Sequence, residues 1–272
     1  MNDLGMQYWF DLIPVLLQNV TVLGVCCVRL FIIMTLFPPT ADGVMKGAIR
    51  NGTVLMFCAF IALGQPASFA AALHGTYLIE VGLREAMIGL VFGFAASTVF
   101  WVAEAAGTYV DYLAGYNNAQ ITNPLRNEQA TPSGTLLSQL AIVSFWTLGG
   151  MTFLLGALYD SYRWWPITGE VVPVSRDFLA AFAMRQTDTL MQTVAKLAAP
   201  MLFILLLVDV GFGIASKSAQ KLELNSLSQP VKGAVTVLLL ALLVGVFAGQ
   251  VRDQLSLRDL AISLQTMSHA KR

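Results

Sequence analysis

The sequence predicts an all-α membrane protein built from about six hydrophobic helical segments. Of its 272 residues, 56% are hydrophobic and only 12% are charged, whereas soluble domains carry roughly 25% charged residues. Several uncharged stretches approach the roughly 20 apolar residues that a membrane-spanning helix needs. Apolar and polar residues do not alternate with a period of two, which does not favour a barrel of strands. The formal net charge of +0 gives no basis for binding nucleic acid.

The predicted segments follow one another with short polar connections. They comprise residues 12–37, 51–73, 78–103, 135–158, 190–215 and 231–251. The first has no cleaved-signal pattern before it, so we expect it to be retained. The tail, 252–272, places Leu257, Leu260 and Leu264 on one helical face and is predicted to be amphipathic. If every segment crossed a bilayer, basic residues would divide almost evenly between the two sides, which suggests that some helices are not ordinary spans.

Small residues recur every four positions in the third segment and beyond it. Gly89 and Gly93 begin the pattern, and Gly107, Asp111 and Gly115 continue it. This spacing predicts a long helix from about residue 80 to 115 that packs closely against other helices.

Ionisable residues inside the apolar segments are costly at bilayer depth and usually face protein or water. They include Arg29, Arg84, Glu85, Glu104, Asp111, Lys196 and Asp209. They could form a proton path, or they could pair between helices and fix packing, and we favour pairing for most of them. Lys196 and Asp209 would lie on nearly opposite faces of one helix, so each should pair with another helix or subunit.

A polar loop rich in asparagine and glutamine, residues 116–134, follows the long predicted helix. It could be a solvated connection or it could close an aqueous path, since non-helical backbone at membrane depth persists only against protein or water. Motifs of hydrolases, metalloproteases and nucleotide-binding proteins are absent from the sequence, and its three cysteines form no metal-binding pattern. We therefore expect no enzyme activity, no cofactor and no metal.

Several stretches together resemble the T component of the type III secretion export apparatus, the SctT, YscT and HrcT type, whose flagellar counterpart is FliR. Arg29, the pair Pro38–Pro39 and Arg50 resemble its early pattern. The stretch LREAMIGLVFGFAASTVFWVAEAAGTYVDYLAG resembles its central signature, and LVDVGFGIASKSAQKLELNSLSQPVKG, with Asp209, Pro230 and Lys232, its late one. Asn123-Pro124 departs from the flagellar Asp-Pro, and AQKLELN from the frequent Pro-Gln-Leu-Asn, which favours a virulence or symbiosis system.

The resemblance implies a structural, single-copy subunit of an export gate in the bacterial inner membrane. Its helices would form tilted hairpins, arranged like an R-type and an S-type gate subunit joined end to end. Residues 1–188 would be the R-like half, 189–251 the S-like hairpin and 252–272 the tail. The partners implied are five R-type and four S-type subunits, the U-type switch protein, the V-type export ring and unfolded secretion substrates, besides lipid.

The resemblance also implies roles for individual residues. The loop 116–130 would plug the closed pore. The plug residues would be Tyr116, Asn117, Asn118, Gln120, Ile121, Asn123, Pro124 and Arg126. Residues for subunit packing and intersubunit charges would be Arg29, Arg84, Glu85, Gly89, Gly93, Glu104, Gly107, Asp111, Gly115, Lys196, Asp209 and Lys232. The alternatives are a proton-coupled transporter using Lys196, Asp209 or Glu104 and a membrane-anchored enzyme subunit.

Overall fold

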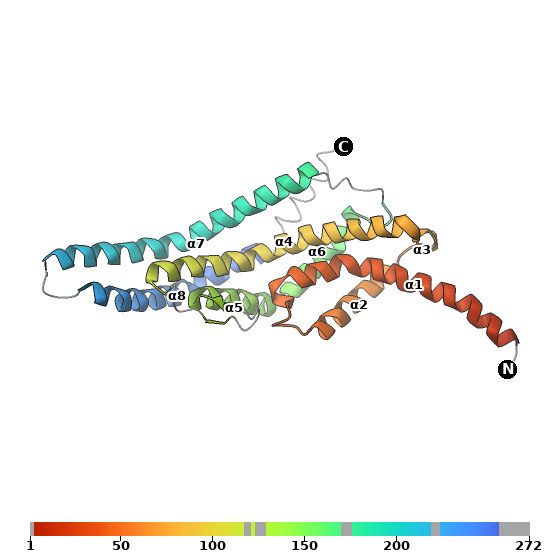
Figure 1. Ribbon diagram of the computed structural model, residues 1–272, viewed down its shortest axis with the longest axis horizontal. Coiled ribbons are helices and arrows are strands. Elements are labelled where there is room, and N and C mark those ends of the chain that lie inside the picture. Colours follow the sequence, from red (N-terminus) through yellow and green to blue (C-terminus); the bar gives the residue numbers. More distant parts are fainter. Residues whose placement is uncertain (1–2, 117–120, 123–128, 170–175, 219–223, 256–272) are drawn as a thin grey trace. The chain divides into compact units, whose positions relative to one another are not determined.

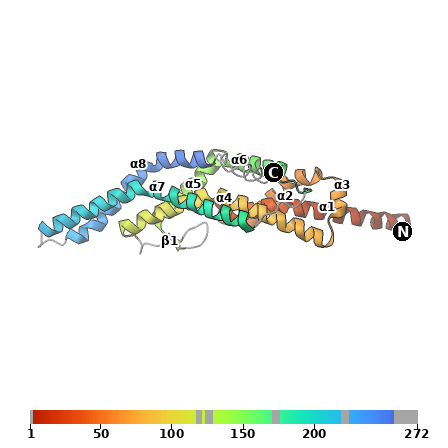
Figure 2. The same cartoon turned by 90° about the horizontal axis from the view of Figure 1, so that it is seen from above.

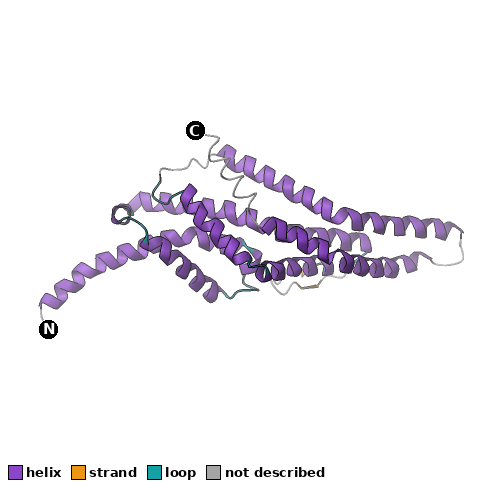
Figure 3. Ribbon diagram, turned by 180° about the vertical axis from the view of Figure 1, so that it is seen from behind, coloured by secondary structure: helices purple, strands orange, loops and turns teal. Residues whose placement is uncertain are grey.

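The computed structural model describes residues 3–116, 121–122, 129–169, 176–218 and 224–255. Nearly all of these residues are helical, as Figures 1 and 3 show. The chain forms two compact units. The first contains Met1–Ala96 and Leu155–Leu179, and the second contains Ser97–Leu154 and most of the chain after Ala180. Most of the predicted amphipathic tail, residues 256–272, lies outside the described residues.

The first unit is built around α1 (Asp3–Leu36), which packs against α2 (Gly47–Leu63) and α3 (Ala67–Ala72). Pro38 and Pro39 end α1, because proline lacks the backbone donor that would continue the helix, and the short 3-10 helix η1 (Pro38–Thr40) follows. The first part of α4 (Gly75–Ala114) lies against α1. The unit is completed by the end of α6 (Gly150–Trp164).

The second unit contains the end of α4, α5 (Pro132–Thr147), α7 (Arg176–Ser218) from Ala180 on, and α8 (Leu224–Leu255). Helices α7 and α8 run side by side, and α5 packs against α8 (Figures 1 and 2). Their core contains Val110 and Ala114 of α4 with Met201 and Leu205 of α7. This core holds the C-terminal end of α4 against the α7–α8 hairpin.

The expected long helix from about 80 to 115 is confirmed as α4, which has 40 residues. The expected single segment 51–73 is wrong, because the chain breaks between α2 and α3 at residues 64–66, where Pro66 cannot continue a helix. The expected segment 135–158 is also two helices. Helices α5 and α6 meet at an angle of 74°, next to Gly149 with its positive φ of 72°.

Three helices are long and apolar enough to cross a membrane among the described residues, or up to four if α5 and α6 count as one broken span. Of the six expected segments, 51–73 and 135–158 are each divided between two helices. At about 1.5 Å per residue, the 40 residues of α4 extend about 60 Å, roughly twice the hydrocarbon thickness of a bilayer. The predicted boundary between residues 188 and 189 falls inside α7, and that division into halves stays a prediction.

Candidate functional site

The polar loop leaves the end of α4 and returns to the start of α5. Its described part is a short antiparallel ribbon, β1 (Ile121–Thr122) and β2 (Gln129–Ala130), in which Ile121 pairs with Ala130. Six expected plug residues lie outside the described part of the chain. They are Asn117, Asn118, Gln120, Asn123, Pro124 and Arg126. The site therefore consists of the residues that hold the two ends of this loop.

Asp111 of α4 holds the far end of the loop, where the chain enters α5. Its carboxylate is fully buried and accepts hydrogen bonds from the backbone N–H of Ser133, at 2.7 Å, and from the Ser133 hydroxyl, at 2.6 Å. Ser133 lies in the first turn of α5, where backbone N–H groups lack helical partners and the helix dipole favours a negative charge. The N-cap residue Thr131 makes no side-chain capping bond, so Asp111 caps α5 from a different helix.

Glycines bring α4 and α5 into close contact beside this cap. A Cβ added to Gly107 would collide with the backbone of Ser133 and Gly134, and one added to Gly134 would lie 2.7 Å from the hydroxyl oxygen of Thr108. The Thr131 hydroxyl donates to that same Thr108 oxygen at 3.2 Å. The far end of the loop is thus attached directly to the backbone of α4.

The near end of the loop begins with a glycine-based helix stop. Gly115 has a φ of 85°, its N–H donates to the Tyr112 carbonyl, and the Tyr116 N–H donates to the Asp111 carbonyl at 2.9 Å. This is the Schellman pattern, which satisfies two of the free carbonyls at a helix end. The Leu113 carbonyl, the next one along the chain after those of Asp111 and Tyr112, accepts from Lys232 of α8 at 3.2 Å.

Helix α8 contacts this turn at three neighbouring positions. Gln229 packs against Gly115, Gly233 packs against the hydroxyl of Tyr116, and Lys232 also forms an ion pair with Asp209 of α7. The two ends of the loop are therefore held by different partners, the near end by α8 and the far end by α4.

A buried charged network joins three helices of the first unit. Arg29 of α1 and Glu85 of α4 form a two-point ion pair at 2.8 and 3.0 Å, and both are fully buried. Arg29 also donates to the Ser161 hydroxyl at 2.8 Å and to the Trp165 carbonyl at 3.0 Å. The ring of Tyr162 covers the guanidinium at 3.9 Å. All three guanidinium nitrogens of Arg29 therefore donate at least one hydrogen bond, which offsets the cost of burying this charge.

Arg84 extends this network to the turn after α6. It lies 3.5 Å from Glu85, donates to the Gly169 carbonyl at 2.7 Å and also donates to the Ile167 carbonyl. This buried network fixes α1, α4 and the end of α6 to one another.

Six of the charges that were predicted to act between subunits also have partners within the chain, and their role between subunits stays a prediction. They are Arg29, Arg84, Glu85, Asp111, Asp209 and Lys232. The small residues Gly89 and Gly93 likewise face α1, because an added Cβ would lie 2.7 Å from the Arg29 carbonyl oxygen and 3.1 Å from the Leu36 side chain, respectively. At these two glycines the close neighbour is therefore a helix of the same chain.

Two aromatic residues support the buried network. Trp165 is buried and packs edge-on against Phe92, and Tyr162 covers Arg29. Ser133 and Gln229 were not among the predicted site residues. The serine directly after Pro132, which starts α5, could have indicated a helix-capping position at Ser133. Nothing in the sequence indicated a contact of Gln229.

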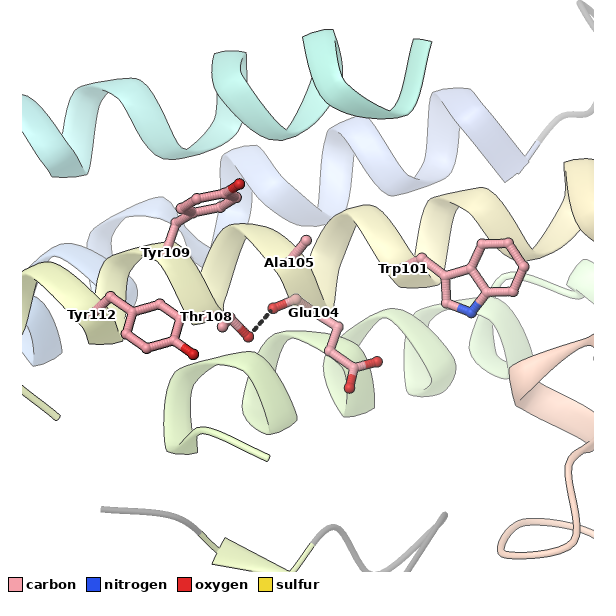
Figure 4. A pocket seen from close by; sticks show the side chains of 6 residues that line it. All are labelled: Trp101, Glu104, Ala105, Thr108, Tyr109 and Tyr112. Carbon is pink, nitrogen blue, oxygen red and sulfur yellow. Dashed lines mark hydrogen bonds between the residues drawn. The ribbon is translucent and has the colours of Figure 1, made fainter. Parts of the chain in front are cut away.

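The remaining predicted residues are Lys196 and Glu104, and the Glu104 carbonyl accepts a hydrogen bond from Thr108 near the far end of the loop. Lys196 is exposed on α7. Glu104 is half-buried on one face of α4, where it lines a pocket of about 430 Å³. Figure 4 shows that α4 supplies all the labelled side chains, which include Trp101, Tyr109 and Tyr112. No group of three or more metal-ligating side chains occurs in the part of the chain that the structure describes.

Long apolar helices, with polar groups that mainly fix the ends and contacts of those helices, define the class as a multi-pass membrane protein. Comparison with known proteins then gives the family. Residues 20–257 match the family described as bacterial export proteins, family 1. The chain belongs to this family, and within it to the T and FliR type of the type III export apparatus.

Individual relatives include both secretion and flagellar proteins. The chain is 32% identical over 218 residues to the Yop proteins translocation protein T of Yersinia pestis, covering 79% of this chain and 82% of that protein. It is 30% identical over 221 residues to the secretion system apparatus protein SsaT of Salmonella typhimurium, covering 80% and 85%. Identity to the flagellar biosynthetic protein FliR of Bacillus subtilis is 23% over 198 residues, covering 73% and 75%.

Proposed function

We propose that this chain is the single-copy T subunit of a type III secretion export gate in the bacterial inner membrane. In this role it closes a helical assembly of five R-type and four S-type subunits, through which unfolded proteins are secreted. Residues 1–188 act as the R-like half, 189–251 as the S-like hairpin and 252–272 as the tail. The U-type switch protein and the V-type export ring are the further partners, and the apparatus serves virulence or symbiosis.

We further propose that the loop 116–130 plugs the closed pore. The observation that carries this proposal is the attachment of both loop ends by polar contacts, to Asp111 at the far end and to Lys232 at the near end. These contacts satisfy free groups at the ends of α4 and α5 and also fix both ends of the loop, as a segment that blocks a pore requires. A loop rich in asparagine and glutamine with no net charge can bind water without selectively attracting secreted polypeptides of either charge.

Exposed apolar surface supports a place in an assembly or in lipid. Large apolar side chains are exposed along α7, including Phe203 at 61% and Ile214 at 66%. Soluble monomers rarely leave contiguous apolar surface of this kind uncovered.

Deletion of residues 117–129 tests the plug. In membranes that contain the whole gate, the deletion should raise leakage of ions or small molecules while the R-type and S-type subunits still co-purify with the chain. A variant with a Gly/Ser segment of the same length is the control that separates loop chemistry from loop length. Unchanged leakage through a fully assembled gate would remove the plug role.

The transporter alternative rests on Lys196, Asp209 and Glu104. Asp209 is paired with Lys232, which favours a packing role for this carboxylate. Replacing Lys196 with glutamine separates the two functions, because a coupling lysine would abolish solute transport and a packing lysine would only weaken assembly.

A further inference from the structure

We propose that Lys232 is the positioning residue for the near end of the plug, because it fastens the C-terminal end of α4 to the α7–α8 hairpin. This inference rests on the proposed plug function of the loop 116–130. It assigns to Lys232 a role inside the chain, in addition to the contact between subunits that the family resemblance implies.

Lys232 supplies a hydrogen-bond donor to a carbonyl at the C-terminal end of α4. In the Schellman turn, the N–H groups of Tyr116 and Gly115 donate to the carbonyls of Asp111 and Tyr112. The turn supplies no donor to the Leu113 carbonyl. The Lys232 ammonium donates to this carbonyl, and a cation is also favoured there by the negative end of the helix dipole. The lysine side chain is 13% exposed, whereas its hydrogen bond to Leu113 lies in an exposed position and the Asp209 side chain is 41% exposed.

Asp209 holds the same ammonium group from the other side. It lies on α7 and contacts Lys232 at 2.5 Å, so one lysine joins α4, α7 and α8. Removal of Lys232 therefore breaks two contacts at once. Removal of Asp209 breaks only the contact between α7 and α8 and leaves the hydrogen bond to α4.

The neighbouring positions of α8 place the turn itself. Gln229 and Gly233 lie one turn apart and contact Gly115 and Tyr116, the two residues where the loop begins. Residues spaced by three or four positions share a helix face, so Lys232 anchors the face that supports the loop. A shift of α8 relative to α4 would move the first residues of the loop with it.

Four variants of the whole gate separate this role from general packing. Lys232→Met removes both contacts, Lys232→Arg keeps a donor and a positive charge, and Asp209→Asn keeps the bond to Leu113. The double variant Asp209→Lys with Lys232→Asp restores an ion pair between α7 and α8 with its direction reversed. It cannot restore the bond to Leu113, because a carboxylate has no proton to donate to a carbonyl.

We expect Lys232→Met to raise leakage through the closed gate by about tenfold, since a charge-assisted hydrogen bond of this kind changes an equilibrium by roughly one order of magnitude or more. Lys232→Arg and Asp209→Asn should leak within about threefold of the parent gate on the same scale. The double variant should assemble like the parent and still leak like Lys232→Met. A purely structural ion pair would instead be rescued by this exchange.

Two measurements make the outcome decisive. The deletion of residues 117–129, measured beside these variants, must leak, or the plug function itself fails. Spin labels at Tyr112 and Val231, in a chain without its native cysteines, report the distance between α4 and α8 independently of leakage. A broader distance distribution in Lys232→Met is expected. An unchanged distribution, a tight gate in Lys232→Met, or a tight double variant would each overturn the positioning role.

Discussion

Asp111 and Ser133 are 22 residues apart, yet the carboxylate of the first accepts both hydrogen-bond donors of the second. The two residues belong to helices on either side of the polar loop. Their contact holds the far end of the loop, where α5 begins. The hydrogen bond from Lys232 to the Leu113 carbonyl holds the near end, where α4 stops. The helix ends on both sides of the loop are therefore held in place by polar contacts.

Replacing Asp111 with alanine should destabilise the chain by about 2 kcal/mol, because α5 loses its cap and a buried backbone N–H loses its acceptor. The apparent melting temperature of the purified gate in detergent measures this effect. Ser133→Ala is the matched control, since it keeps the backbone bond to Asp111 and should cost about half as much. Equal stability of Asp111→Ala and the parent chain would contradict the capping role.

Replacing Arg29 with methionine should destabilise the chain by about 3–5 kcal/mol, because Glu85 is left buried without its main partner. Steady-state level in membranes and melting in detergent both report the loss. The double variant Arg29→Met with Glu85→Met should be more stable than the sum of the two single effects. Simple additivity would show that the two side chains do not act as a pair.

Replacing Gly89 with alanine should destabilise the contact between α1 and α4 by about 1–3 kcal/mol, because the new Cβ meets the Arg29 carbonyl oxygen at 2.7 Å. Gly82→Ala on the same helix is the control. Nothing lies within 4 Å of its added Cβ, so it should be neutral or stabilising by up to about 1 kcal/mol. Similar melting temperatures for the two variants would argue against close packing at Gly89.

Local patterns predicted much of the fold. The four-residue spacing of small residues between Gly89 and Gly115 predicted α4, because the periodicity of a single helix depends only on residues close together in the sequence. The break at Pro66 was missed, since hydropathy alone does not distinguish one apolar helix from two. The bend between α5 and α6 was missed for the same reason, although Gly149 marks it.

The partners of the candidate site could not be predicted in the same way. Arg29 and Glu85 are 56 residues apart, and only the packing of α1 on α4 brings them together. Thr131 is the ordinary capping residue for α5 by position, so nothing in the sequence indicated that Asp111 of another helix takes its place. Of the ionisable residues in apolar segments, Arg29, Arg84, Glu85 and Asp111 are buried. Lys196 is exposed and Glu104 is half-buried, so apolar neighbours in the sequence did not determine burial, and the fold determined which charges pair.

We infer that this chain functions as one subunit of a larger export gate. The mass and composition of the complex, isolated through a tag on this chain from its own membranes, test this inference. We expect one copy of the chain together with R-type and S-type subunits in a single particle. A stable monomer in detergent, which transports a small solute after reconstitution into vesicles, would contradict it.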